Sequence, residues 1–224
     1  MKNKNLKTYK SLQYFKSEIE ETQTLIHALE SQVIATRELL IFIKAQSSPD
    51  WSKHKKFLEI NDAQVKKTYE LGFVAFFANF ECFMFEFLKE LLRKYPNSFK
   101  SEKIIKFDDI KDFEQIADIK DYFIDSYAIE KSYDIEEWSK FLLQKFGIRV
   151  FKNSKDLQRF KALNSFRNLM LHSGSKTNSK FRNEMKIFLK TKVPLGEKVN
   201  LDREKYFHIL YTMLKLLIVN IEKS

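Results

Sequence analysis

The chain contains very little glycine, proline and cysteine. Its 224 residues include 4 Gly, 3 Pro and 1 Cys, although Gly and Pro together make up about 12% of an average protein. This deficit argues against an all-β fold, because the many turns of such a fold need residues with special backbone angles. Neither GxGxxG nor GxxxxGK[ST] occurs, which argues against a doubly wound nucleotide-binding fold. Collagen-like and Pro-rich chains are excluded as well.

Export and membrane signals are also missing. The single cysteine, Cys82, excludes a disulfide framework. The basic N-terminal segment has no apolar region of the kind that a secretory signal carries. The longest apolar run, residues 71–88, is interrupted by Glu81 and Glu86, whose carboxylates make a span through lipid costly. We therefore expect a cytoplasmic protein that does not bind membranes.

The N-terminal segment carries a heptad pattern. From Leu12 to Ile43, apolar residues and two threonines recur at alternating spacings of three and four, and residues 1–48 contain neither Gly nor Pro. The pattern predicts one helix of about 35 residues, about 50 Å long, that ends at Ser47–Asp50 because Pro49 disfavours helix before it. Packing along its own domain and an intermolecular coiled coil both fit this pattern.

A second long helix is predicted from Asn61 to Tyr95, closed by Pro96. Its apolar residues cover nearly the whole circumference, which is typical of a central, buried helix. Glu81 falls within one apolar stripe, where a carboxylate is costly unless it is paired. Two interpretations remain open for Glu81: a member of a buried polar network, or a carboxylate that faces an active site.

Shorter helices are predicted for the rest of the chain. We expect two or three helices in residues 97–150, one helix in residues 154–172 and a last helix in residues 202–222. Pro194 and Gly196 indicate a short extended excursion near 187–200. The fold class is therefore all-α, a bundle of five to seven helices. We expect a single domain over 1–224, in which 1–60 form the long N-terminal helix and a linker and 61–224 form the bundle.

The sequence FRNLMLHSG, residues 166–174, places Arg167, Asn168 and His172 near one helix end. Asn168 and His172 are four residues apart and share a face, and the long side chain of Arg167 can reach that face. Imidazole can act as general base or general acid near neutral pH, and guanidinium can hold phosphate oxygens. The three groups suit cleavage of an RNA phosphodiester without a metal or another cofactor. By the residues alone, an ordinary helix end remains the alternative.

Residues 166–174 resemble the RNxxxH signature of HEPN domains, all-α proteins many of which are metal-independent endoribonucleases. The run FANFECFMFEFLKELL, residues 77–92, is similar to the helix that carries an acidic residue at the active site of such proteins, and Glu81 takes that place. The C-terminal stretch resembles that of the prokaryotic RiboL-PSP and MAE-type HEPN groups. The resemblance covers about residues 65–224.

The resemblance implies a homodimer in which both copies contribute Arg167 and His172 to one composite cleft, with Asn168 orienting the pair. It further implies a toxin of a toxin–antitoxin system or an effector of phage defence, with an antitoxin or other defence protein as partner. One subgroup continues the motif as HxY and is controlled by modification of that tyrosine; Ser173 and Gly174 stand here instead. The alternative is a HEPN domain without catalysis, serving as an interaction or assembly module, or an RNA-binding protein.

The net charge of +10 is concentrated around the motif. Residues 149–192 contain 12 Lys and Arg but 2 Asp and Glu, whereas the other 180 residues hold equal numbers of both signs. An RNA backbone needs such a concentration of positive charge. We expect four cations in this segment to contact RNA: Lys161, Lys176, Lys180 and Arg182.

Overall fold

The computed structural model describes residues 6–46, 51–98, 106–172, 176–188, 194–197 and 202–224. For 43–46, 51–62 and 107 within these ranges, only the backbone is described. Of the excursion predicted near 187–200, residues 189–193 and 198–200 lie outside the described ranges, as do Ser173 and Gly174.

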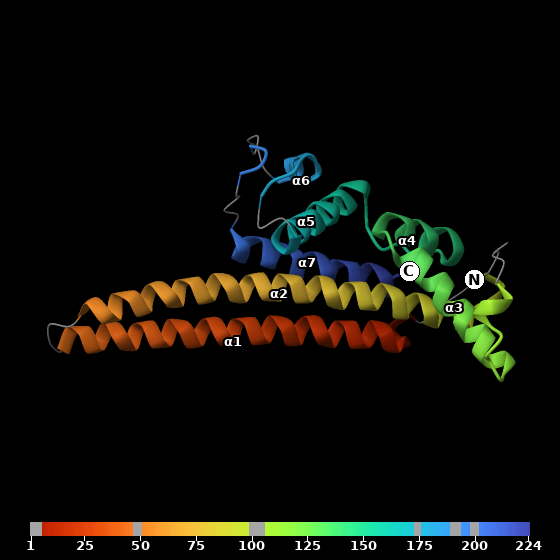
Figure 1. Cartoon of the computed structure of the whole chain (residues 1–224), viewed down its shortest axis with the longest axis horizontal. Coiled ribbons are helices and arrows are strands. Elements are labelled where there is room, and N and C mark those ends of the chain that lie inside the picture. Colours follow the sequence, from red (N-terminus) through yellow and green to blue (C-terminus); the bar gives the residue numbers. More distant parts are fainter. Residues whose placement is uncertain (1–5, 47–50, 99–105, 173–175, 189–193, 198–201) are drawn as a thin grey trace. The chain divides into compact units, whose positions relative to one another are not determined.

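The elements of the described residues are all helices (Figure 1), so the prediction of an all-α fold is confirmed. Seven α-helices are accompanied by short 3-10 turns and by one π-helical turn, Leu142–Phe146. The α-helices are α1 (Lys10–Gln46), α2 (Trp51–Lys94), α3 (Ile116–Ser132), α4 (Ile135–Phe141), α5 (Ser154–His172), α6 (Ser179–Glu184) and α7 (Arg203–Glu222).

Most helix boundaries lie where the sequence places them, and α2 is the exception. Helix α1 has 37 residues, α5 spans the predicted range, and α7 begins one residue later than predicted. Helix α2 begins at Trp51, ten residues before the predicted start at Asn61. Residues 51–60 contain neither Gly nor Pro and are rich in helix-forming Lys, Leu and Glu. The helix therefore starts at Trp51, two residues after Pro49 in the sequence.

The chain groups into two compact units, each built from several segments. The first unit comprises 1–16, 79–157 and 216–224, and the second comprises 17–78 and 158–215. Helices α1, α2, α5 and α7 each contribute residues to both units. The expectation of one domain over 1–224 stays a prediction.

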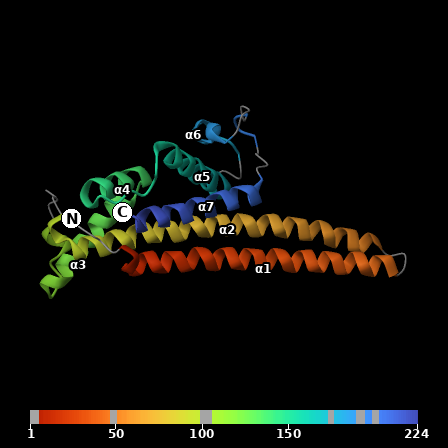
Figure 2. The ribbon, with the colours of Figure 1, turned by 180° about the vertical axis from the view of Figure 1, so that it is seen from behind.

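In the second unit, α1 and α2 run side by side and antiparallel, and both views of the ribbon show this pairing (Figures 1 and 2). Helix α7 packs on α2 through aromatic rings: Phe207 stacks on Phe76 at 4.8 Å between ring centroids and meets Tyr69 edge-on at 5.3 Å. Gly72 of α2 lies against Ile26 of α1 and Phe207 of α7. These contacts form the core of the second unit.

In the first unit, an aromatic cluster joins α1, α2 and α4. Phe15 stacks on Phe83 at 4.5 Å, and the ring of Trp138 meets Phe83 edge-on at 6.0 Å. The indole N–H of Trp138 donates to the backbone carbonyl of Met84 at 3.1 Å, so this fully buried polar group is satisfied. The carboxylate of Glu90 accepts from the backbone N–H groups of Lys10 and Ser11, which supplies the first turn of α1 with partners from α2.

Residues 108–137 form an acidic segment with 11 Asp and Glu but only 3 Lys. Most of its acidic side chains are exposed, as is usual for such a run of charge. Part of it pairs with the basic end of α2. Asp125 lies 2.9 Å from the Lys89 ammonium, and Asp121 lies 3.1 Å from the Arg93 guanidinium. Both pairs join α3 to α2 within the first unit.

Helix α2 is buried on one side only, although its sequence predicts burial all round. One stripe of the helix consists of phenylalanines that are all buried: Phe73, Phe76, Phe80, Phe83 and Phe87. Leu71 is 58% exposed, and Cys82 is exposed as well. The stretch Ala63–Lys94 is long and apolar enough to cross a membrane, and half of its most apolar window is buried. Because core helices pass the same test, the absence of membrane binding stays a prediction.

Candidate nucleic-acid interface

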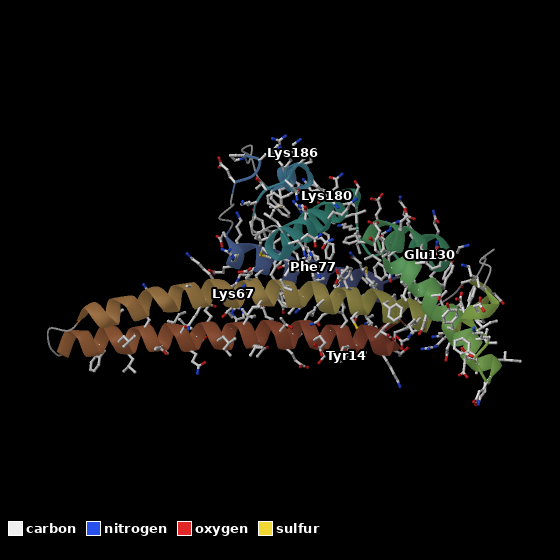
Figure 3. All side chains as sticks on the ribbon, viewed as in Figure 1. Tyr14, Lys67, Phe77, Glu130, Lys180 and Lys186 are labelled. Atoms are coloured by element: carbon white, nitrogen blue, oxygen red, sulfur yellow. The ribbon has the colours of Figure 1, made fainter. Side chains whose placement is uncertain are left out.

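Helix α5 is anchored in the second unit by aromatic side chains on its inner face. Phe160 packs against Phe77 at 5.3 Å between ring centroids, and Phe166 meets Phe73 and Tyr206 edge-on, each at 5.3 Å. Figure 3 labels Phe77 on α2. Because Phe166 precedes Arg167 directly, these contacts fix the rotation of α5 about its axis at the motif.

The structure brings two of the three motif residues, Arg167 and Asn168, into contact near the end of α5. The guanidinium Nη1 of Arg167 lies 3.5 Å from the amide oxygen of Asn168, to which it donates. Both side chains are half-buried, while His172 is the last residue of the helix and its side chain is exposed. Asn168 and His172 are one helical turn apart and share a face. The convergence of the imidazole with the other two groups stays a prediction.

Lys161 belongs to the same face of α5. Lys161, Ser165, Asn168 and His172 are spaced by four, three and four residues, which aligns them along one stripe of a helix. Lys161 is half-buried and Ser165 is 7% exposed, so the stripe borders the buried side of α5. An ammonium group thus lies on the motif's side of the helix, two turns before Asn168.

The other three predicted RNA-binding residues lie on the segment that follows. Lys176 and Lys180 are exposed and Arg182 is half-buried; Figure 3 labels Lys180 of α6 and Lys186 just after it. Two buried side chains, Phe181 and Met185, hold α6 to the second unit, and Asn178 caps the helix by accepting from the backbone N–H of Phe181 at 2.8 Å. Lys180 and Arg182 are therefore carried by an anchored helix, and Lys176 lies just before it.

Buried Thr177 connects this segment to the described part of the predicted excursion. Its backbone N–H donates to the carbonyl of Glu197 at 3.0 Å, and its own carbonyl accepts from Gly196 at 2.9 Å. Its hydroxyl donates to the carbonyl of Pro194. Gly196 has a φ of 77°, a left-handed conformation that favours glycine. Residues 194–197 thus form a turn that is held to Thr177 by hydrogen bonds.

Glu81 is not buried, although it falls within an apolar stripe of α2. Its side chain is exposed on α2, so water solvates the carboxylate and the burial cost expected for it does not arise. The interpretation as a member of a buried polar network is wrong for this reason. Glu81 belongs to the first unit, whereas Arg167, Asn168 and His172 belong to the second. Its role as a carboxylate facing the motif stays a prediction.

The second unit contains a cavity that the sequence did not predict. It has a volume of about 480 Å³ and is lined by side chains from α1, α2 and the residues at the start of α7, among them Arg37, Lys66 and Tyr69. Burial, followed by the nearby Glu30 carboxylate, raises the pKa of the Tyr69 phenol. The lining comes from three distant segments without a common motif, so no signal in the sequence could have located it. None of the motif residues lines this cavity.

No family model, curated protein or solved structure matches the chain. Within the residues that the structure describes, no group of three or more His, Cys, Asp or Glu side chains is arranged to hold a metal ion.

Proposed function

We propose that the chain is a metal-independent endoribonuclease. The observation that carries the proposal is the arrangement at the end of α5. The exposed His172 shares a face with Asn168, which lies one helical turn before it, and the Arg167 guanidinium donates a hydrogen bond to the Asn168 amide oxygen. The concentration of positive charge in residues 149–192 supports it, because a polyanionic substrate is attracted to such a region. The resemblance to the RNxxxH signature adds the reaction type.

In the proposed reaction, the 2′-hydroxyl of a ribose attacks the neighbouring phosphorus while one imidazole removes its proton. The bond from phosphorus to the 5′-oxygen breaks, and a second imidazole protonates that oxygen as it leaves. The products carry a 2′,3′-cyclic phosphate and a 5′-hydroxyl. Arg167 stabilises the negative charge that builds up on the phosphate oxygens, and Asn168 positions the Arg167 guanidinium through their 3.5 Å contact.

The reaction needs both a base and an acid, and each chain supplies one motif histidine, His172. We therefore propose that the active form is a homodimer in which both copies contribute Arg167 and His172. We further propose, on the resemblance alone, that the protein is a cytoplasmic toxin or phage-defence effector, restrained by an antitoxin or another partner protein. The non-catalytic assembly module is the competing proposal.

The test is incubation of the purified full chain with single-stranded RNA in the presence of EDTA. We expect cleavage, and we expect His172→Ala and Arg167→Ala each to lower its rate by at least about 100-fold, since losing an acid–base or charge-stabilising group has effects of that size. The His172 side chain is exposed, so the thermal unfolding temperature of His172→Ala should match that of the wild type, whereas loss of the half-buried Arg167 should lower it slightly.

Two matched controls separate the motif from general charge effects. His27→Ala removes an exposed imidazole and Arg37→Ala removes an exposed guanidinium, both on α1 and outside the basic segment 149–192. Both should cleave RNA at the rate of the wild type. Wild-type protein that leaves RNA intact, or a His172→Ala variant as active as the His27→Ala control, would contradict the proposal.

A further inference from the structure

Helix α1 carries a second apolar stripe beside the heptad residues noted in the sequence. Six residues recur at alternating spacings of three and four: Leu25, Ala28, Gln32, Ala35, Leu39 and Phe42. We call them the outer stripe. All six are exposed, and the three large side chains, Leu25, Leu39 and Phe42, are 57%, 58% and 60% exposed. The outer stripe is therefore apolar surface that the described part of the second unit leaves uncovered.

The composition of the outer stripe differs from that of an ordinary solvated helix face. From Leu25 to Leu39 it contains no charged residue, and Leu29 at its edge is 38% exposed. Thr36, on the same edge, donates its hydroxyl hydrogen to the carbonyl of Gln32 at 2.8 Å, so it can be covered without losing a hydrogen bond. An uncharged stripe at heptad spacing is the pattern by which one helix packs along another.

We propose that a second copy of this chain packs antiparallel on the outer stripe, with the two-fold axis passing at Gln32. Leu25 and Leu39 are each seven residues from Gln32, so an axis at that point places Leu25 against Leu39 of the partner subunit. The same axis places the larger Leu29 against Ala35 of the partner subunit, which lets the helices approach closely. Such self-complementarity about a single point is what an isologous interface requires.

The charges that continue the stripe select the antiparallel orientation. Toward the N-terminus, Glu21 and Glu18 follow at spacings of four and three from Leu25. In a parallel pair, Glu18 and Glu21 of one copy would lie against the same two residues of the other copy. Repulsion between these like charges disfavours the parallel arrangement. An antiparallel pair moves the two acidic ends to opposite ends of the contact.

The size of a specific interface sets how far the contact must extend. Such an interface buries about 1,000 Å² or more in total, so the pairing must use the whole length of the outer stripe from Leu25 to Phe42, whose large side chains are all more than half exposed. The outer stripe lies on α1 and the motif on α5, so this contact between copies is separate from the one that would form the composite cleft, and the inference does not depend on the proposed ribonuclease activity.

Cysteine cross-linking tests the orientation. In a full-length Cys82→Ser background, the axis at Gln32 predicts that Gln32→Cys forms a disulfide-linked dimer under mild oxidation. Leu25→Cys and Leu39→Cys should not cross-link separately but should do so when the two proteins are mixed. Ile41→Cys is the matched control, because Ile41 is 51% exposed on another face of α1. Efficient self-linking of both Leu25→Cys and Leu39→Cys would indicate a parallel pair and overturn the proposal.

A charge exchange tests the pairing without cross-linking. Leu25→Glu or Leu39→Lys alone should halve the particle mass measured by light scattering. The double variant should restore the mass, because each new carboxylate then meets a new ammonium group across the axis. A monomeric wild-type protein, an unchanged mass in both single variants, or no recovery in the double variant would overturn the proposal. RNA cleavage measured on the same samples reports separately on the motif.

Discussion

The buried faces of the helices are determined by individual aromatic and apolar residues. The stripe from Phe73 to Phe87 and the apolar face of α7 from Phe207 to Ile221 are buried, as their spacing predicts. The exposure of Leu71, Glu81 and Cys82 was not predictable in the same way. When nearly every position around a helix is apolar, the sequence pattern does not show which sides the neighbouring helices cover, and that depends on tertiary packing.

Gly72 shows how closely α1, α2 and α7 approach each other in the second unit. A methyl group at this position would lie 2.7 Å from Cγ1 of Ile26 and 2.8 Å from Cε2 of Phe207. We expect Gly72→Ala to lower the free energy of unfolding by about 1–3 kcal/mol in urea titrations, because overpacking outweighs the better helix propensity of alanine.

Leu71→Ala is the control for this prediction, because Leu71 is 58% exposed on the same helix. Its free energy of unfolding should stay within about 0.5 kcal/mol of the wild type. A gain of stability in Gly72→Ala would mean that helix propensity dominates and that the close approach is absent.

Buried tyrosines predict a loss of stability at alkaline pH. Burial raises the pKa of Tyr127 in the first unit and of Tyr206 in the second above the ordinary value of 10.0. The unfolded chain therefore loses these phenolic protons first, and the free energy of unfolding should be intact below pH 10 and fall as the pH rises above it.

The measurement is urea unfolding at a series of pH values, together with ultraviolet titration of the phenolates. Tyr206→Phe cannot ionise at that position, so its stability should fall less steeply above about pH 10. Equal slopes for the variant and the wild type would contradict the assignment to Tyr206.

The short helix α4 and the turn after it have clear signals in the sequence. Ile135, Trp138, Leu142 and Phe146 are spaced three, four and four residues apart, as on one face of a helix, and all four are buried. Gly147 ends the segment with a φ of 68°. The sequence could not show that its last turn is π-helical, Leu142–Phe146, because that geometry depends on packing.

Asp134 starts α4 by accepting hydrogen bonds from the backbone N–H groups of Glu136 at 2.8 Å and Glu137 at 3.1 Å. We expect Asp134→Ala to lower the free energy of unfolding by about 1 kcal/mol, because two N–H groups lose their partner. Asp134→Asn keeps the accepting oxygen and should retain most of the stability. Equal losses in both variants, measured by urea unfolding, would indicate that the charge rather than the cap matters.

For the molecule as a whole, the sequence predicted the all-α class and the grouping of Arg167, Asn168 and His172 on one helix end. It did not predict that Glu81 and the motif fall in different compact units, since helix α2 is continuous and its sequence marks no boundary between Ala78 and Asn79. The excess of positive charge surrounds the motif in the sequence, and the cations on α5 and α6 are carried by helices with buried anchors.

We propose that His172 and Arg167 cleave RNA through attack of its own 2′-hydroxyl. The chemistry of the new RNA ends, determined by mass spectrometry after digestion in EDTA, tests this reaction. We expect a 2′,3′-cyclic phosphate on one fragment and a 5′-hydroxyl on the other, with neither formed by His172→Ala. Fragments with a 3′-hydroxyl and a 5′-phosphate, or intact RNA after prolonged incubation with the wild-type protein, would contradict it.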